Sequence, residues 1–483
     1  MNVSTGSYQR VPGETSELGK TAPELWDQMT SLDPPAPVVV ERIGSKDLSA
    51  AREIVEEAVF AMGPSGRRMV PSAGAIFPYA ILVLCRYGAV QGNGRGTAPA
   101  ATWGLFRLGA NGSAVTRVPV PAAAAATLSQ IIPLSTDLDQ SYILTLTRPW
   151  LSMRKYGPRG YLYSQVDAAH AAVNILGTAL QTVDAALHVD PSDLAARCIL
   201  ADYLPFHELH SVLVLRNRAD RRGTFYFDVE IENTSAKKTP AFNFEAQAWS
   251  GLVDPLEANA VWVHAPGPEP VIATKQLESG QATLISDWRE LSQKRKSAKA
   301  FSARKLTLAA LDGVLESIGT PLPTNLTTGG QGSVELTVVL SHNASFSSAE
   351  EETLARRFSV RRIESPDHAG GIVKACMGQR HVAHAQAFLV LHSRRTDVIP
   401  SPETHSIRRV LFRAGAAAQL AYLGAARHGI GVFTVGGFDA SAWKTYAQIG
   451  SDDEVLCLLA LGSDVAKDSP RADQEEKATA HGE

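Results

Sequence analysis

The sequence predicts an α+β protein made of two similar halves. The chain has 483 residues, which exceeds the size of a usual single hydrophobic core. Two Ala-rich stretches, 167–179 and 413–426, carry small residues at matching positions, as expected for long buried helices that approach another helix closely. Each stretch lies between β-branched, apolar runs that are typical of strands. We therefore expect two equivalent units, at residues 36–222 and 285–470.

The same order of elements is predicted in both halves: helix, strand, strand, long central helix, strand. In the first half, the predicted elements are 48–62, 81–84, 142–146, 167–179 and 211–215. In the second half, they are 308–318, 334–339, 387–391, 413–426 and 455–460. The first predicted helix of each half is followed directly by a glycine, which is a common residue after a helix end.

Three segments lie outside these halves. Residues 1–35 are polar and rich in Pro, Ser and Thr, which predicts a flexible N-terminal segment. Residues 223–284 combine a strand-like run, 224–231, with Pro and Gly, and are expected to form an ordered connector. Residues 471–483 are expected to be a disordered tail. Neither a secretory signal pattern nor an apolar run of about 20 residues is present, so we expect a cytoplasmic protein.

The composition argues against several classes of partner and site. The 46 basic and 49 acidic residues give a net charge of -3, so no overall field favours nucleic acid or a membrane. The four cysteines are scattered and are expected to be reduced core residues. Because no CxxC or HExxH pattern occurs, no metal site is predicted. The His pairs 207/210 and 381/384 are interpreted as structural.

A basic run at 293–301 is the first candidate for binding chemistry. It contains Arg295, Lys296, Ser297 and Lys299. Cationic side chains and a hydroxyl at this spacing can converge on one phosphate through charge-assisted hydrogen bonds. Taken alone, such a run is more typical of a solvated helix end.

The order basic, basic, Ser, any, basic, any, Phe in this run resembles the FMN-dependent nitroreductase superfamily. The resemblance implies that Arg295, Lys296, Ser297 and Lys299 grip the phosphate of FMN. Two later basic residues, Lys467 and Arg471, resemble residues that also reach this phosphate.

A Gly-rich stretch after the second central helix extends the resemblance. The stretch 427–439 resembles the family's segment whose backbone lies against the flavin ring, where a residue without Cβ permits close approach, and Gly429, Ile430 and Gly431 are the expected contacts. A helix C-cap followed by a turn would also explain these glycines.

The first half resembles a branch of the superfamily, the SagB-type azoline dehydrogenases. The resemblance lies in 70–78, which contains Pro71, Ser72, Ala73 and Gly74, and in 154–163 followed by 167–170. It implies that Pro71 to Gly74 cover the flavin ring and that Lys155 and Tyr156 act as the catalytic base. Without the resemblance, Lys155 and Tyr156 would be interpreted as part of an exposed loop before a helix.

The two halves carry complementary parts of this site. Superfamily members are intertwined dimers that bind FMN between subunits. When the halves are aligned, 71–74 falls against 327–330 and the run around Ser297 falls against 39–43, so neither half retains both parts. The resemblance therefore implies a tandem nitroreductase-like fold that forms an intramolecular pseudo-dimer with one composite FMN site.

The expected function is FMN-dependent oxidation of thiazolines or oxazolines to azoles in a modified, ribosomally made peptide, with oxygen reoxidising the flavin. Two other functions stay open at this point. One is an NAD(P)H-dependent reductase of nitro compounds or quinones, and the other is a non-catalytic scaffold that binds a peptide or a partner enzyme. The residues also leave open whether the chain works with a cyclodehydratase complex or forms a homo-oligomer.

Overall fold

The computed structural model describes thirteen stretches of the chain. These are residues 40–62, 68–89, 101–109, 114–131, 140–156, 159–190, 194–204, 206–216, 225–231, 284–326, 333–363, 368–395 and 407–465. The predicted N-terminal segment and C-terminal tail lie outside them, as do residues 232–283 of the predicted connector.

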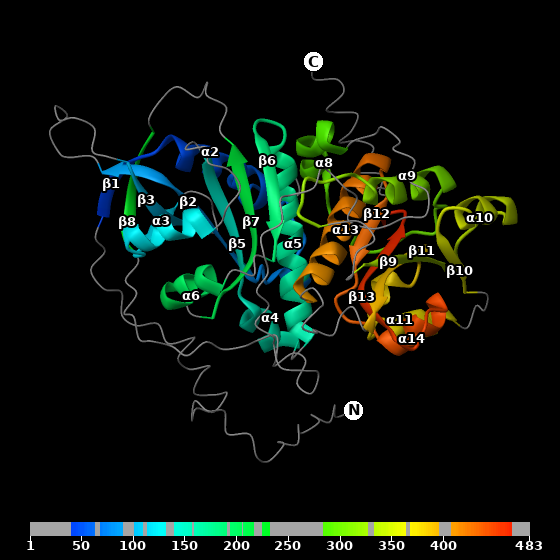
Figure 1. The fold of residues 1–483 in the computed structure, drawn as a ribbon. Coiled ribbons are helices and arrows are strands. Elements are labelled where there is room, and N and C mark those ends of the chain that lie inside the picture. The colour runs from blue at the N-terminus through cyan, green and yellow to red at the C-terminus, as the bar shows by residue number, and fades with distance from the viewer. Residues whose placement is uncertain are drawn as a thin grey trace, which may run out of the picture.

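Each half of the chain contributes one sheet (Figure 1). The first sheet has the strand order β1-β8-β4-β3-β2-β5-β7-β6. Its strands are β1 Val40–Gly44, β2 Tyr79–Ala89, β3 Thr102–Leu108, β4 Val115–Val118, β5 Gln140–Thr147, β6 Asp184–Val189, β7 Glu208–Arg216 and β8 Tyr226–Ile231. Strand β8 lies in the predicted connector but pairs with β1 and β4, so the first sheet extends past residue 222.

The second sheet has five strands in the order β10-β9-β11-β13-β12. They are β9 Glu335–Leu340, β10 Ser359–Arg362, β11 Ala387–Arg394, β12 Gly431–Thr434 and β13 Asp453–Gly462. Every pairing in this sheet is antiparallel except that of β10 with β9.

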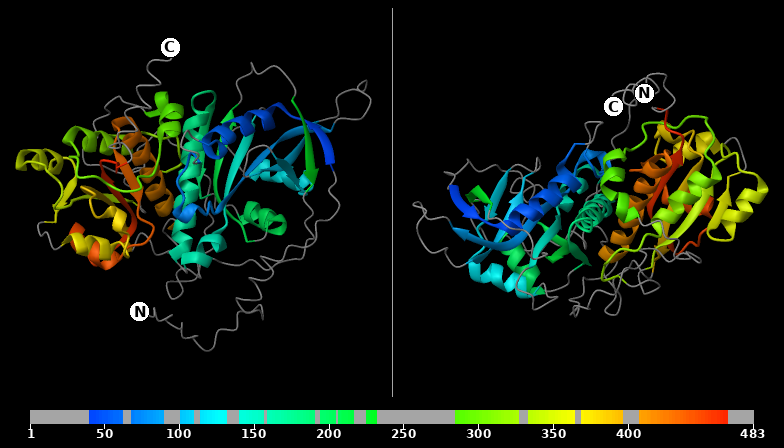
Figure 2. Two further views of the ribbon diagram at one scale, coloured as in Figure 1. Left: turned by 180° about the vertical axis from the view of Figure 1, so that it is seen from behind. Right: turned by 90° about the horizontal axis from the view of Figure 1, so that it is seen from above.

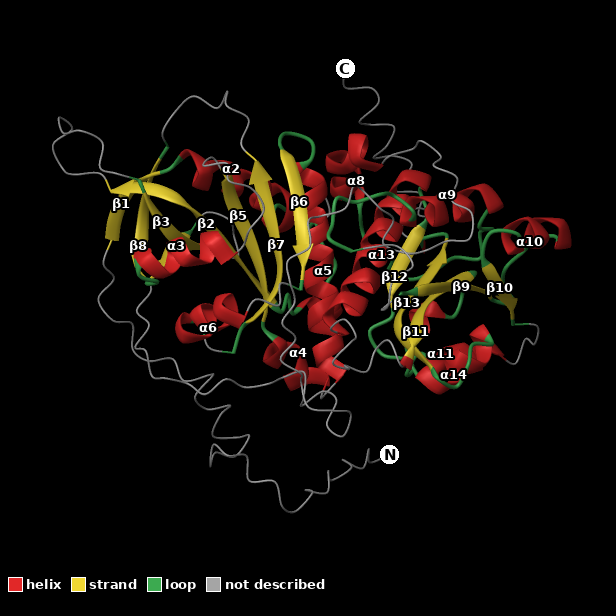
Figure 3. Cartoon of the chain, in the orientation of Figure 1, coloured by secondary structure: helices red, strands yellow, loops and turns green. Residues whose placement is uncertain are grey.

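Helices pack around both sheets (Figure 3). The α-helices are α2 Lys46–Val55, α3 Ala122–Ile131, α4 Pro149–Tyr156, α5 Gly160–Ala179, α6 Leu194–Tyr203, α8 Trp288–Lys294, α9 Leu308–Ile318, α10 Ser348–Ala355, α11 His368–Ala375, α13 Ile407–His428 and α14 Ala440–Ala447. Shorter turns of helix cover Glu56–Phe60, Ala73–Ala75, Leu284–Asp287 and Arg380–Val382.

The two sheets share a four-stranded core. The orders β2-β5-β7-β6 and β9-β11-β13-β12 are antiparallel throughout, and the strands follow one another along the chain in the same way. In each half, the long helix, α5 or α13, comes between the second and third of these strands in sequence. The α+β class and the predicted element order are present in both halves, with further strands that include β6 or β12 after each long helix.

The long helices α5 and α13 pack against each other between the two sheets (Figure 2). Nearly all residues of both helices are buried, including the Ala-rich stretches that predicted them. Their close approach depends on a small residue at Gly415. A Cβ atom built there would lie 2.6 Å from Ala169 Cβ and 2.8 Å from the Val166 carbonyl oxygen.

Segments of the second half also extend over the first. Leu187 N on β6 donates to the Pro323 carbonyl at 2.9 Å, and Val189 N donates to Asn325 Oδ1 at 2.8 Å. Trp288 at the start of α8 is fully buried and donates its indole N–H to Asn174 Oδ1 on α5 at 2.9 Å. One hydrophobic cluster therefore extends through both halves, in addition to a smaller cluster within each half.

No helix in the described parts of the chain is long and apolar enough to span a membrane.

Candidate functional site

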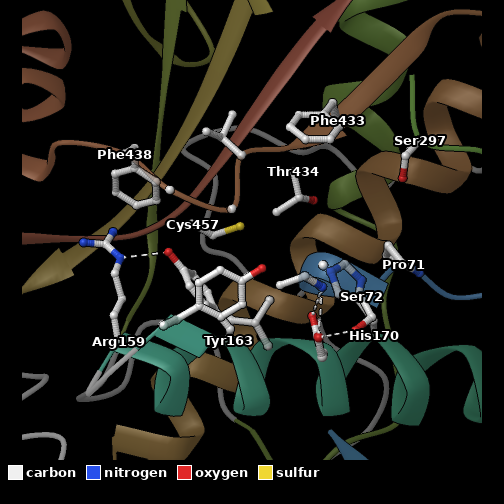
Figure 4. A pocket seen from close by; sticks show the side chains of 18 of the residues that line it. Pro71, Ser72, Arg159, Tyr163, His170, Ser297, Phe433, Thr434, Phe438 and Cys457 are labelled. Atoms are coloured by element: carbon white, nitrogen blue, oxygen red, sulfur yellow. Dashed lines mark hydrogen bonds between the residues drawn. The ribbon is translucent and has the colours of Figure 1, made fainter. Parts of the chain in front are cut away.

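A cavity of about 800 Å³ lies between the two halves (Figure 4). The first half contributes the loop Pro71 to Gly74 and side chains from α4 and α5. The second half contributes Ser297, the segment 433–438 and the side chains of Met377 and Gln379. Figure 4 shows Phe433 and Phe438 across the cavity from Tyr163 and His170, which rise from α5. The structure thus brings the Pro-Ser loop and Ser297, which are distant in sequence, to one site.

The loop that contains Pro71 to Gly74 is fixed by Asp167 of α5. Ser72 Oγ donates to Asp167 Oδ2 at 2.6 Å, and Ala73 N donates to the same oxygen at 3.0 Å. Ser72 Oγ in turn accepts from Phe77 N at 2.8 Å. Residues Ala73–Ala75 make a single tight turn in which Gly74 has a φ of 61°, a conformation that glycine adopts without steric cost. One carboxylate therefore sets the shape of this wall.

Asp167 is almost completely buried, with 4% of its surface exposed. Burial disfavours the charged carboxylate and raises the pKa of Asp167 to about 7, against the opposing effect of the hydrogen bonds from Ser72 and Ala73. The cavity wall consequently contains a carboxyl group that titrates near neutral pH. Such groups are frequent at functional sites.

Lys155 and Tyr156 lie at the end of α4, against the same loop. A Cβ built on Gly74 would lie 2.5 Å from both Lys155 Nζ and the Tyr156 hydroxyl oxygen, so the two polar groups converge on this glycine. Tyr156 lines the cavity and packs edge to face against Tyr163, with ring centroids 5.0 Å apart. Lys155 is exposed, with its ammonium 5.2 Å from the centre of the Tyr156 ring.

Arg159 links the two walls of the cavity. Its Nε donates to the Tyr163 hydroxyl at 3.0 Å, and its guanidinium carbon lies 4.1 Å from the centre of the Phe438 ring. The first contact is within the first half, whereas the second reaches the other half of the chain. Stacking of a guanidinium on an aromatic ring stabilises such a crossing.

The predicted phosphate-binding residues separate into different environments. Ser297 lines the cavity, and its hydroxyl lies 3.1 Å from the hydroxyl of Tyr422. Lys296 pairs with buried Asp464 at 3.2 Å, and Lys299 is exposed. Lys467 and Arg471 lie outside the described residues.

Arg295 connects the two halves through backbone contacts. It is buried and donates to the carbonyl oxygens of Arg68 and Met69, both at 2.7 Å. These carbonyls directly precede the Pro-Ser loop. Arg295 therefore holds the loop from the side of the second half, while Asp167 holds it from α5.

The predicted Gly-rich segment lies partly elsewhere. Gly429 and Ile430 line a second, smaller cavity of about 150 Å³, together with Arg304, Lys305 and His428. Gly429 has a φ of 67°, which fits the alternative interpretation as a residue at the helix end. Gly431 is buried at the start of β12, where a Cβ would lie 3.1 Å from Ala298 Cβ.

Two glycines from the second half, Gly436 and Gly437, also line the main cavity. A Cβ at Gly436 would meet no atom within 4 Å, so the backbone faces open space there. The Gln379 amide donates to the Gly437 carbonyl at 2.7 Å and to the Cys376 carbonyl at 2.8 Å. This amide fixes the glycine segment in place.

Several lining residues were not singled out as site residues, although some lie in the stretches 154–163, 167–170 and 427–439 that carry the resemblance: Arg159, Tyr163, Asp167, His170, Gln379, Tyr422, Phe433, Phe438 and Cys457. Four of them, Asp167, His170, Tyr422 and Cys457, lie in predicted elements that the sequence marks as core. A further signal was the presence of three polar residues, Asp167, His170 and Asn174, within an otherwise Ala-rich helix. Buried polar side chains in such a helix require partners and often mark a site.

Comparison with known proteins supports a nitroreductase-like fold. Residues 293–463, about a third of the chain, match the model of the nitroreductase family. A protein of Anabaena variabilis assigned to the nitroreductases overlaps 91% of this chain and 99% of its own, with 17% identity and a TM-score of 0.58. The fold likeness therefore extends over both halves.

Two further solved structures overlap only part of the chain. A protein of Bacillus subtilis, YdfN, also assigned to the nitroreductases, covers 38% of this chain and 92% of its own, with 16% identity and a TM-score of 0.25. The Escherichia coli microcin synthetase complex McbBCD with truncated pro-MccB17 covers 45% of this chain and 80% of the matched chain, with 14% identity and a TM-score of 0.29. No curated protein matches this sequence.

The cavity has the size and walls that suit a flat aromatic cofactor. Its volume lies within the range of ligand pockets, roughly 300–1,000 Å³. Aromatic side chains stand on both sides, and an open glycine backbone lies at Gly436. Ser297 supplies a hydroxyl from the run that resembles a phosphate-binding segment. Among the described residues, no group of His, Cys, Asp and Glu is placed to hold a metal ion.

Proposed function

We propose that this protein is an FMN-dependent dehydrogenase that oxidises thiazolines or oxazolines to azoles in a modified, ribosomally made peptide. One observation carries the proposal: the composite cavity, where the Pro-Ser loop, Tyr156 and Ser297 meet. The branch of the superfamily is argued from the sequence patterns at 70–78 and 154–163, which resemble the SagB-type dehydrogenases.

The two halves would form an intramolecular pseudo-dimer with one FMN site. The shared four-stranded core and the packing of α5 against α13 support this arrangement. Each wall comes from a different half, which is how a duplicated chain can retain a site that lies between two subunits. We propose that Pro71 to Gly74 contact the flavin ring and that Ser297 and Lys299 bind the FMN phosphate. Lys467 and Arg471 would complete the set of phosphate-binding residues.

Arg295 and Gly429 receive narrower roles in this proposal. Because Arg295 donates to the carbonyls of Arg68 and Met69, its first role is to join the two walls. Gly429 ends the long helix α13, and Gly431 permits close packing of β12 against Ala298. The backbone nearest the ring is then supplied by 434–437.

Azoline oxidation removes a hydride from one ring carbon and a proton from its neighbour. Bound FMN supplies the two-electron acceptor for the hydride. We assign the proton to Lys155, with Tyr156 beside it, because both side chains reach Gly74 at the edge of the cavity. The neighbouring Tyr163 and Phe438 rings exclude water from the reacting face.

The proposal implies a peptide partner. A peptide-bound ring can reach this site at the edge where Lys155 is exposed beside the Pro-Ser loop. A cyclodehydratase that forms the azoline is the class of enzyme that must act before this one. We expect this chemistry in the cytoplasm, where ribosomal peptides are made.

Azole formation by the FMN-loaded protein tests the proposal. The substrate is a short peptide that carries a thiazoline, and the product is read as a loss of two mass units. We expect Lys155→Ala to reduce turnover by a factor of about 10²–10⁴ while the flavin spectrum stays unchanged. The exposed Lys294→Ala, whose side chain pairs with Glu290 on the surface, is the matched control and should retain full turnover.

One result would count against the assigned base, and another against the function itself. If Lys155→Ala forms azole at the full rate, Lys155 is not the base, although the protein is still a dehydrogenase. Rapid bleaching of the flavin by NADPH, with no azole formed from the peptide, would instead identify a reductase of nitro compounds or quinones.

A further inference from the structure

His170 lies on α5 in the wall of the cavity, on the same side as Ser72 (Figure 4). The residue is 1% exposed, and burial lowers the pKa of His170 to about 3. The imidazole is therefore neutral at ordinary pH. A neutral imidazole has one ring nitrogen that donates a hydrogen bond and one that accepts, and its neighbours decide which is which.

The orientation of Asn174, one turn further along α5, is fixed by two partners of known type. The Trp288 indole N–H can only donate, and it lies 2.9 Å from the Asn174 oxygen Oδ1. The Ala58 carbonyl can only accept, and it lies 2.6 Å from the Asn174 amide nitrogen Nδ2. If the amide were reversed, its nitrogen would face the Trp288 N–H donor and its oxygen would face the Ala58 carbonyl acceptor. Asn174 Oδ1 is therefore the atom that also faces Gln419.

Gln419 on α13 takes its orientation from Asn174. Its amide group lies 3.2 Å from Asn174 Oδ1, which can only accept, so the nearer atom is the nitrogen Nε2. The oxygen Oε1 of Gln419 is then the atom 3.1 Å from His170 Nδ1. Because Oε1 can only accept, His170 Nδ1 carries the proton. The second ring nitrogen, Nε2, is left as an acceptor.

We propose that His170 Nε2 is an acceptor in the cavity wall that receives a hydrogen bond from an N–H or O–H group of the bound cofactor. The inference rests on the proposed function, because FMN offers such donors in the imide N–H of its ring and in its ribityl hydroxyls. Within the described residues, Gln419 is the hydrogen-bond partner of the imidazole, and it occupies Nδ1. A ligand that presents only an acceptor to His170 would be rejected by repulsion between lone pairs.

This chain of hydrogen bonds also explains why polar residues lie within α5 and α13, which are otherwise mostly apolar. Trp288, Asn174, Gln419 and His170 form a continuous series from the start of the second half to the cavity wall. Each member fixes the donor or acceptor sense of the next. In this account, Asn174 and Gln419 are positioning residues, and His170 is the group that contacts the cofactor.

The tautomer can be measured directly. Long-range ¹H–¹⁵N NMR of ¹⁵N-histidine protein separates protonated from unprotonated ring nitrogens, and a His170→Asn variant assigns the signal. We expect that Nδ1 of His170 is protonated and Nε2 is unprotonated from pH 5 to 8, with and without FMN. On adding FMN, the Nε2 signal should shift. The opposite tautomer, or an Nε2 signal that FMN leaves unchanged, would overturn the inference.

The affinity for FMN gives a second, independent readout. His170→Asn can retain the donor to Gln419 but lacks the cavity-facing acceptor, and we expect it to weaken FMN binding about tenfold, as one buried hydrogen bond predicts. Gln419→Leu removes the acceptor that holds the proton on His170 Nδ1, so the imidazole can adopt either tautomer. We expect this substitution also to weaken FMN binding, although Gln419 itself does not contact the ligand. Near-UV circular dichroism checks that both variants keep the native core.

A comparison of FMN with 3-methyl-FMN identifies the donor. If the ring imide N–H is the partner, methylation should weaken binding to the wild type but not to His170→Asn. If a ribityl hydroxyl is the partner, methylation should affect both proteins equally while the tenfold difference between them persists. Equal FMN affinities for the wild type and His170→Asn would overturn the inference and leave the proposed function intact. A wild-type protein that binds no FMN would overturn both.

Discussion

At the scale of single residues, the Asp167 carboxyl connects the central helix to the Pro-Ser loop. The hydrogen bonds from Ser72 and Ala73 only partly offset the cost of burying a charged carboxylate, so the pKa of Asp167 is raised to about 7. In the unfolded chain, an aspartate releases its proton near pH 4. The folded FMN-free protein thus binds this proton more tightly than the unfolded chain does.

We predict that this difference makes stability fall as pH rises. Between about pH 4 and pH 7, the unfolded state loses the Asp167 proton while the folded state keeps it, so the free energy of unfolding decreases by an amount on the order of a few kcal/mol. Asp167→Asn removes the titration and keeps the shape. Urea unfolding of both proteins from pH 4 to 8 checks this, and a constant difference across that range would contradict it.

Gly74 gives a second test at the residue scale. Gly74→Ala places a Cβ against Lys155 Nζ and the Tyr156 hydroxyl in a left-handed backbone conformation, so it should displace both side chains. We expect turnover of an azoline peptide to fall at least tenfold, with a stability loss of about 1–2 kcal/mol.

Gly378→Ala is the matched control for Gly74→Ala. Gly378 also has a positive φ, 80°, but a Cβ there meets no atom within 4 Å. It should show a similar stability loss and near-normal turnover. Equal turnover losses in both variants would show that Lys155 and Tyr156 have no special role beside Gly74.

The sequence predicted part of the site at this scale. Pro71 to Gly74 and Ser297 were predicted to lie at one site, and they do line one cavity. They could be predicted because each belongs to a short, recognisable sequence pattern. The contacts of Arg295 with the Arg68 and Met69 carbonyls could not be predicted, because a backbone acceptor leaves no trace in residue type. Asp167 and His170 belong to the pattern 167–170, but the sequence does not show that their side chains face the cavity.

At the scale of elements, the long helices were the most predictable feature. Their small and apolar residues extend over several turns, and α5 and α13 include both predicted stretches. Strands β6 and β12 were missed for a physical reason. β12 has only four residues, and β6 contains the buried polar residue His188, so neither presents a clean apolar run. Their places are fixed by pairing with β7 and β13.

The contact between α5 and α13 gives a prediction about these elements. Gly415→Ala should gain about 1 kcal/mol of helix propensity but lose about 1–3 kcal/mol through overpacking, because the new Cβ meets Ala169 and the Val166 backbone. We therefore expect a net loss of stability and a weaker affinity for FMN, since both helices line the cavity.

Gly370→Ala provides the control for this helix contact. Gly370 lies in α11, and a Cβ there meets no atom within 4 Å, so the substitution should stabilise the protein slightly. Thermal unfolding measures both changes. A Gly415→Ala protein at least as stable as Gly370→Ala would show that the two helices have room to separate.

At the scale of the whole molecule, the halves depend on each other for both the core and the site. The segment around Asn325 extends along β6, Trp288 lies against α5, and Arg295 reaches the loop before Pro71. These crossings explain how one chain can hold a site that needs two walls. The pairing of halves was predicted from repetition in the sequence, whereas the crossing segments emerge only from the folded arrangement.

The central claim of this account is that the chain forms one composite FMN site between its halves. The direct measurement is the ratio of flavin to protein chain after reconstitution with excess FMN and removal of the unbound flavin, read from visible absorbance and amino-acid analysis. A single composite site predicts a ratio near one, reduced strongly by substitutions on either wall, such as Ser72→Tyr or Ser297→Tyr. A ratio of two, or a protein that stays colourless, would contradict it.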